Sequence, residues 1–168
     1  MKDLKIICDI DGVVADFMGH YKKWFNIDTY PSRLQEYTIL KNVYNLRNNK
    51  KFWTTVPKLR DIDFPIVAYC TKRINSKSYT KEWIIKNNLP NKPIYQMVCY
   101  SGNKSRLIKG KCDIFIEDSI TNFTECNKSG IFTLLLTTPE NKHYNTPLRI
   151  NSLNYGDIYN KYEEYNKY

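Results

Sequence analysis

The sequence contains no apolar run close to the roughly 18–20 residues that a membrane-spanning helix needs. It also has no signal-peptide pattern, because its first residues lead directly into a short strand-like segment. We therefore expect an intracellular, cytoplasmic protein without membrane contact. Hydrophobic residues make up 42% and aromatic residues 14% of the 168 residues, which excludes a disordered chain and favours one domain with a small insertion.

Cysteine and histidine do not occur in a metal-binding or disulfide pattern. None of the five cysteines forms a C-x-x-C pair, and the two histidines are far from all of them in the sequence. An odd number of cysteines in strand-like surroundings favours buried, reduced thiols over disulfides or a zinc site. The five are Cys8, Cys70, Cys99, Cys112 and Cys126.

Glycine and alanine are scarce, whereas lysine, asparagine, isoleucine and tyrosine are abundant, as an AT-rich coding sequence would produce. This bias gives one explanation of the net charge of +9, which otherwise suggests a nucleic-acid partner. The charges are scattered, with short clusters only near residues 49–51 and 104–111. The charge therefore suits an anionic, phosphorylated small molecule, and it is weak support for a polymer.

The stretch that organises the chain is an apolar run that ends in two aspartates and a glycine. Residues 4–8 predict a buried parallel strand, and Asp9 and Asp11 follow where that strand ends. Gly12 permits a turn that lets the two carboxylates converge. Carboxylates this close repel each other unless they share a proton or a cation, and a hard ion such as Mg²⁺ suits their oxygens.

Strands and helices alternate along the rest of the chain, which predicts βαβ units and a parallel sheet. We expect an α/β fold with a Rossmann-like parallel sheet that carries helices on both faces. The expected strands are 65–71, 93–99, 112–119 and 131–137, with a short edge strand within 148–153, and the expected helices are 78–88, 102–108, 121–127 and 155–165.

The segment between the first two strands is too long for a simple crossover helix. It has helical patterns at 18–25, 32–40 and 41–48, with Ser32 as an N-cap, and it ends near the aromatic pair Phe52-Trp53. We therefore expect a small helical cap inserted after the first strand. The predicted division is a core of residues 1–17 and 60–168 and a cap of residues 18–59.

Groups suited to phosphate chemistry follow other strands as well. The second strand ends at Thr71, and the fourth ends at Glu117 and Asp118, with Lys104 shortly before it. The carboxyl ends of parallel strands share one edge of the sheet, where ligands bind in such folds. Residues that are far apart in the sequence are therefore expected to meet there.

Four segments occur in this order: a strand that leads into Asp9 and Asp11, a strand that ends at Thr71, Lys104 before a helix, and a strand that ends at Glu117-Asp118. Together they resemble the motifs of the haloacid dehalogenase (HAD) superfamily of phosphohydrolases. The resemblance covers residues 4–137 and includes an insertion between the first two motifs. It implies that Asp9 is the nucleophile that forms an aspartyl-phosphate, and that Asp11 is the general acid and base. It also implies phosphate binding by Thr71, Lys72 and Lys104. The implied Mg²⁺ ligands are Asp9, the backbone carbonyl of Asp11, Glu117 and Asp118, with Asp118 favoured over Glu117 as a direct ligand.

Within the superfamily, the run Asp9–Phe17 and the short cap most resemble the 5'(3')-deoxyribonucleotidases, which implies deoxynucleoside monophosphates as substrates. Aromatic side chains can stack on a base. The expected substrate-binding residues are Phe17, Tyr44, Phe52, Trp53 and Arg73. The sequence departs from that family at Lys72-Arg73, where small residues and a proline are usual, at the Glu-Asp pair of the fourth motif, and in its shorter cap.

Three alternatives remain open from the sequence. A polynucleotide 3'-phosphatase would use Lys72, Arg73 and Lys77 to hold the phosphates of a nucleic-acid end. A protein that binds phosphate or nucleic acid without catalysis could use the same scaffold, although it would not require the full set of strand-end groups. A glycosyltransferase could hold a metal with the D-x-D pair, but it would not need Thr71 and Lys104.

Overall fold

The computed structural model describes residues 3–27, 33–98 and 102–167, with the side chains of residues 33–37 excepted. Its elements alternate as the sequence predicts. They are β1 (Ile6–Cys8), α1 (Phe17–Phe25), α2 (Arg33–Asn45), α3 (Lys50–Thr54), β2 (Ala68–Thr71), α4 (Lys77–Lys86), β3 (Ile94–Gln96), α5 (Ser105–Ile108), β4 (Ile114–Glu117), α6 (Ile120–Lys128), β5 (Thr133–Leu136), β6 (Arg149–Ile150) and α7 (Tyr155–Tyr165).

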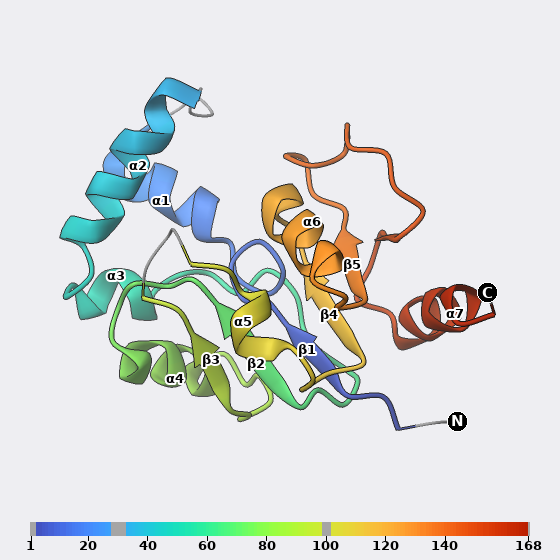
Figure 1. The fold of residues 1–168 in the computed structure, drawn as a ribbon. Helices are drawn as coiled ribbons and strands as arrows, with labels where there is room; N and C mark the ends of the chain where they lie inside the picture. Colours follow the sequence, from blue (N-terminus) through green and yellow to red (C-terminus); the bar gives the residue numbers. More distant parts are fainter. Residues whose placement is uncertain (1–2, 28–32, 99–101, 168) are drawn as a thin grey trace.

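The six strands form one parallel sheet in the order β3-β2-β1-β4-β5-β6 (Figure 1). This is the order of a doubly wound Rossmann-like fold, so the expected fold class is confirmed. The chain order reverses beside β1, with β2 on one side and β4 on the other. Ligands bind at such a switch point, and Asp9 lies at its carboxyl end.

Helices cover both faces of the sheet because successive strand residues point to opposite sides. Ile6 and Cys8 belong to one apolar cluster, which also contains Trp83 of α4 and Ile158 of α7. Ile7 belongs to a second cluster on the other face, together with Ile108 of α5 and Cys126 of α6. The alternation of buried residues along strands only three or four residues long is therefore enough to build two cores.

The helices α1, α2 and α3 follow β1 and precede β2 in the sequence, and they lie above the carboxyl edge of the sheet (Figure 1). Two helices were expected over 32–40 and 41–48, but α2 is continuous from Arg33 to Asn45 because no proline or glycine interrupts it. Ser32, the expected N-cap, lies outside the described residues. We call the buried side chains of this region the aromatic cluster: Tyr21, Val43, Phe52 and Trp53, with Phe17, Trp24 and Phe25 packed against them.

Two short connections join these helices to the sheet, and they pair with each other. Asp16 donates its backbone N–H to the carbonyl of Pro57, and Leu59 donates to that of Val14, at 2.9 and 2.8 Å. The guanidinium of Arg60 donates to the carbonyls of Gly12 and Val13. These bonds hold the turn after β1 against the segment that returns to β2, beside the end of the sheet.

The cysteines of the described residues carry free thiols, as the sequence predicts, and Cys8, Cys70 and Cys126 are buried. Cys99 lies outside the described residues. None of the helices in the described part of the chain is long and apolar enough to span a membrane.

Candidate functional site

The carboxyl ends of β1, β2 and β4 bring together the residues that we call the sheet-edge site: Asp9, Asp11, Thr71, Lys104, Glu117 and Asp118. Asp9 follows β1 directly, and Glu117 is the last residue of β4. Thr71 ends β2 and is buried, with a hydroxyl that accepts the N–H of Arg73 at 3.3 Å. The structure thus collects groups that lie more than 100 residues apart in the sequence.

Lys104 lies at the centre of this site and is only 1% exposed. Its Nζ is 2.8 Å from Oδ1 of Asp9 and 2.7 Å from Oε2 of Glu117. Burial opposes the charge on Lys104, but the two carboxylates outweigh burial and raise its pKa. Lys109 and Lys111, the other lysines near this motif, are exposed. The lysine of the site is therefore Lys104, a fixed positive charge beside Asp9.

The carboxylates of the site differ in their partners and therefore in their pKa. Burial and the charge of Glu117 raise the pKa of Asp9 well above its usual range, although Lys104 opposes this. Burial and the charges of Glu117 and Asp9 raise the pKa of Asp118 in the same direction. Burial would also raise the pKa of Glu117, but its ion pair and hydrogen bonds with Lys104 lower it.

A cluster of three carboxylates with one buried lysine fits a divalent cation. One oxygen each of Asp9, Glu117 and Asp118 lie within 4.8 Å of one another. Burial first, and then the charge of Glu117, raise the pKa of both Asp9 and Asp118, so a cation would stabilise their ionised forms. Carboxylate oxygens are the ligands that Mg²⁺ prefers. The donor set therefore fits the expected Mg²⁺.

Gly12 allows Asp118 to reach this cluster. Its φ of +83° suits glycine, and a Cβ at this position would lie 1.9 Å from Oδ2 of Asp118. The glycine of the first motif is therefore needed both for the turn after β1 and for the close approach of the acid that follows β4.

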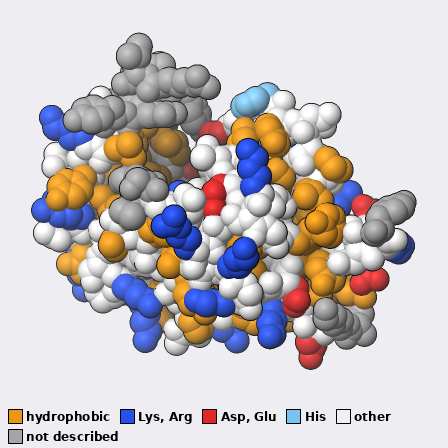
Figure 2. Space-filling model, in the orientation of Figure 1, with side chains coloured by type: hydrophobic (Ala, Val, Ile, Leu, Met, Phe, Trp, Pro, Cys, Tyr) orange, Lys and Arg blue, Asp and Glu red, His pale blue; other side chains and the backbone are white. Residues whose placement is uncertain are grey.

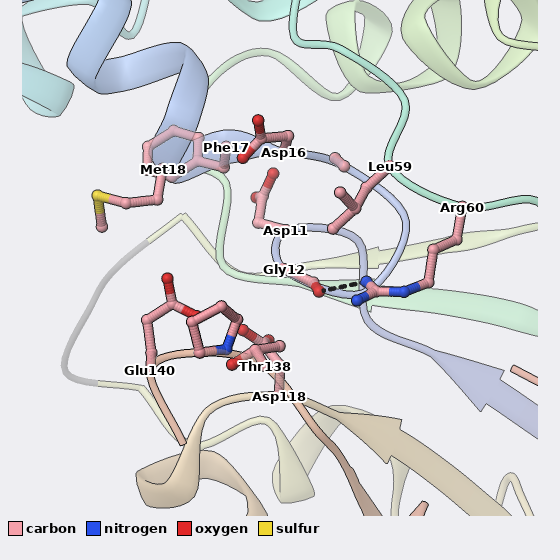
Figure 3. A pocket seen from close by; sticks show the side chains of 12 residues that line it. Asp11, Gly12, Asp16, Phe17, Met18, Leu59, Arg60, Asp118, Thr138 and Glu140 are labelled. Atoms are coloured by element: carbon pink, nitrogen blue, oxygen red, sulfur yellow. Dashed lines mark hydrogen bonds between the residues drawn. The ribbon is translucent and has the colours of Figure 1, made fainter. Parts of the chain in front are cut away.

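Two cavities open on the site and share Asp11, Phe17 and Asp118 among their lining residues. The smaller, of about 250 Å³, contains Asp9, Thr71 and Lys104, together with Lys72, Arg73 and Trp53. The larger, of about 460 Å³, lies between the start of α1, Leu59-Arg60 and the segment after β5 (Figure 3). The smaller cavity thus holds Lys72, Arg73 and Lys104, and the larger one offers adjoining space beside Asp11.

The structure brings some of the expected substrate-binding residues to these cavities and leaves others away from them. Phe17 and Trp53 line the smaller cavity, with their rings stacked 5.9 Å apart. Phe52 is fully buried in the aromatic cluster. Tyr44 is 55% exposed, and the guanidinium of Arg47 covers its ring at 4.1 Å. Neither Phe52 nor Tyr44 lines the two cavities.

Known proteins resemble this chain in structure and not in sequence. No protein-family model matches the sequence, and no curated protein matches it. β-Phosphoglucomutase from Clostridium difficile matches with a TM-score of 0.62 at 14% identity, over 98% of this chain and 99% of that one. A HAD-superfamily hydrolase of subfamily IA from Geobacter sulfurreducens matches with a TM-score of 0.54 at 13% identity, over 89% and 96%. The chain has the HAD fold.

A third HAD-fold protein, the haloacid dehalogenase-like hydrolase SP0104 from Streptococcus pneumoniae, has a TM-score of 0.51 at 15% identity, over 80% of this chain and 84% of that one. At these identities the likeness establishes the fold, and the residues of this chain have to carry any argument about its chemistry.

Sequence reasoning missed two contacts at the sheet-edge site. Asn141, buried in the segment after β5, donates its Nδ2 to the carbonyls of Asp118 and Leu136 at 2.8 and 2.7 Å, which ties that segment to the end of β4. Arg73 was expected among the substrate-binding residues, and its guanidinium donates to the carboxylate of Asp11. The contact of Asn141 could not be predicted, because it lies in a polar loop without a local pattern. The position of Arg73 directly after Thr71-Lys72 did indicate a charged residue at the site.

Proposed function

We propose that this chain is a Mg²⁺-dependent phosphomonoester hydrolase that acts through an aspartyl-phosphate on Asp9. The observation that carries the proposal is the buried contact of Asp9 with Lys104, beside Glu117 and Asp118 and in one cavity with Thr71. A lysine at 2.8 Å orients the Asp9 carboxylate and supplies positive charge next to the place of an incoming phosphate.

Mg²⁺ would be held by Asp9, Asp118 and the carbonyl of Asp11, with Glu117 in a supporting position. Both oxygens of Glu117 already accept bonds, Oε2 from Lys104 and Oε1 from the backbone N–H groups of Asp118 and Ser119. Asp118 is therefore the better direct ligand of the two. When bound, Mg²⁺ would offset the repulsion between the anionic nucleophile and the anionic phosphate.

The residues of the chain divide the two half-reactions between them. In the first, an oxygen of Asp9 bonds to phosphorus and the ester P–O bond breaks, while Asp11 gives its proton to the leaving oxygen. In the second, a water that loses its proton to Asp11 attacks phosphorus and the bond to Asp9 breaks. Thr71, Lys72 and Lys104 hold the phosphoryl oxygens, and the products are an alcohol and inorganic phosphate.

Within this activity we propose (deoxy)nucleoside monophosphates as the substrates of a cytoplasmic 5'(3')-deoxyribonucleotidase. Phe17 supports this because its ring, stacked on the buried Trp53, lines the cavity that holds Asp9 and offers an apolar surface for a base. Arg73 also lines that cavity, where its guanidinium donates to Asp11, so we propose that it serves the substrate through that residue. The division into a core of residues 1–17 and 60–168 and a cap of residues 18–59 belongs to the same proposal.

The test is phosphate release from deoxy- and ribonucleoside 5'- and 3'-monophosphates, p-nitrophenyl phosphate and a 3'-phosphorylated oligonucleotide. Each substrate is measured with Mg²⁺ and with chelator, for the wild type and Asp9→Asn. We expect Mg²⁺-dependent turnover of the monomers and a loss of at least about 10³-fold in Asp9→Asn, because an amide is not a nucleophile here. The matched control is Asp113→Asn, at an acid before β4 that lines neither cavity.

If the protein preferred the oligonucleotide, the result would favour a polynucleotide 3'-phosphatase over a nucleotidase. Lys72 beside the site favours that alternative, but on the face that Figure 2 shows the lysines and arginines are scattered and form no continuous stripe. If the folded protein turned over none of the substrates, the proposed enzymatic function would be wrong. The remaining alternative would be a protein that binds phosphate or nucleic acid without catalysis.

A further inference from the structure

Arg73 is a buried cation that is committed to Asp11. It lies two residues beyond β2 and is 2% exposed. Its Nη2 donates to Oδ1 of Asp11 at 2.7 Å, and its Nε donates to Oδ1 and Oδ2 at 3.1 and 3.0 Å. A guanidinium that engages both oxygens of a carboxyl group fixes the plane of that group as well as its position.

Two indole rings hold this guanidinium in place. The ring centroid of Trp83 lies 4.7 Å from Cζ of Arg73, and that of Trp53 lies 5.8 Å away. Each indole is itself fixed, because Trp83 donates its Nε1 to the carbonyl of Val56 and Trp53 donates to that of Leu46. Both rings are buried, so the Arg73 side chain has little space in which to turn away from Asp11.

We infer that Arg73 is the positioning residue of the proton-transfer group, and that it acts on the reaction through Asp11. This inference rests on the proposed function. The guanidinium engages both oxygens of Asp11 and therefore fixes the orientation of this carboxyl group beside Asp9. In the proposed reaction Asp11 gives a proton to the leaving oxygen as the ester P–O bond breaks, and it takes a proton from the attacking water.

If Arg73 acts through Asp11, its loss should affect alkyl and aryl phosphate esters differently. If it binds phosphate, its loss should affect both esters alike. An alkoxide leaves only with a proton, whereas p-nitrophenolate leaves without one. Loss of a positioned acid therefore slows an alkyl ester much more than an aryl ester. Loss of a phosphate ligand weakens the binding of both esters alike. The value of kcat/KM reports this difference, because it covers the steps up to departure of the leaving group.

The experiment compares Arg73→Met and Arg73→Lys with the wild type on a deoxynucleoside 5'-monophosphate and on p-nitrophenyl phosphate, both with Mg²⁺. For Arg73→Met we expect kcat/KM to fall about 100-fold on the nucleotide and less than about threefold on the aryl ester. Arg73→Lys keeps the charge but cannot bond in the bidentate way, so it shows the same selectivity with a smaller loss and serves if Arg73→Met does not fold.

Two further variants separate the explanations. Lys72→Met removes a cation from the same cavity without touching Asp11, and we expect equal losses on both esters. The double variant Arg73→Met/Asp11→Asn is expected to lose no more than Asp11→Asn alone, because both changes act on one step.

Equal losses on the two esters in both Arg73 variants would overturn the inference in favour of phosphate binding. Unchanged kcat/KM values would overturn it in favour of a purely structural ion pair. Wild-type protein that hydrolyses neither ester would overturn the proposed function itself, and with it the inference, before any variant is measured.

Discussion

The sheet-edge site and the aromatic cluster lie next to each other but are held together by different forces. At the sheet edge, Asp9, Lys104 and Glu117 are buried and joined by ion pairs of 2.7–2.8 Å. In the aromatic cluster, rings such as those of Phe52 and Trp53 meet edge to face at 5.1 Å. Removing one ion leaves the others without compensation, whereas apolar packing loses roughly the contacts that are removed. The two regions should therefore respond very differently to single substitutions.

The largest effect is expected for Lys104→Met. This substitution leaves the carboxylates of Asp9 and Glu117 buried without their cation, which should lower the free energy of unfolding by about 3–5 kcal/mol. Urea unfolding followed by circular dichroism measures it. Lys111→Met is the matched control, because Lys111 is exposed, and it should change stability by less than about 0.5 kcal/mol. Equal stability of the two variants would contradict this account of the site.

A smaller effect is expected for Phe52→Leu in the aromatic cluster. Leucine keeps much of the apolar volume, so we expect a loss of about 1–2 kcal/mol in the free energy of unfolding and nearly unchanged turnover. Tyr44→Leu, at an exposed position, is the control and should change stability little. If Phe52→Leu raised KM for nucleotides at unchanged stability, Phe52 would contact the base in spite of its burial.

The smallest effect is expected from the pH dependence of His20, whose ring nitrogen lies 3.0 Å from the carbonyl of Phe52. Burial lowers the pKa of this histidine. Below the unfolded pKa near 6.5, His20 therefore binds a proton more readily in the unfolded chain than in the folded chain. The folded state loses stability as the pH decreases.

We expect the wild type to lose more thermal stability than His20→Gln between about pH 7.5 and pH 5.5, by less than the Phe52→Leu effect. Thermal unfolding of both proteins at the two pH values measures this difference. Parallel losses in the two proteins would mean that the histidine is not responsible.

Local sequence pattern determined the order of the predicted strands and helices, and it placed Asp9, Thr71 and Glu117 at strand ends, although the third strand ends at Gln96 and not at residue 99. Apolar segments that end at Asp9, Thr71 and Glu117 predict parallel strands, and parallel strands must share one edge. The same rule predicts that Lys104, shortly before the fourth strand, lies near the edge that holds Asp9. Gly12 was also readable, since the turn after β1 needs a positive φ.

Only the tertiary structure decided which partner each side chain meets. Arg73 reads in the sequence as a ligand for substrate, but Trp53 and Trp83 from different helices direct its guanidinium onto Asp11. Phe52 and Tyr44 are both aromatic residues of one segment, yet one is buried and the other exposed. Periodicity and strand ends are local properties of a chain, whereas the partner of a buried charge or ring depends on which elements pack around it.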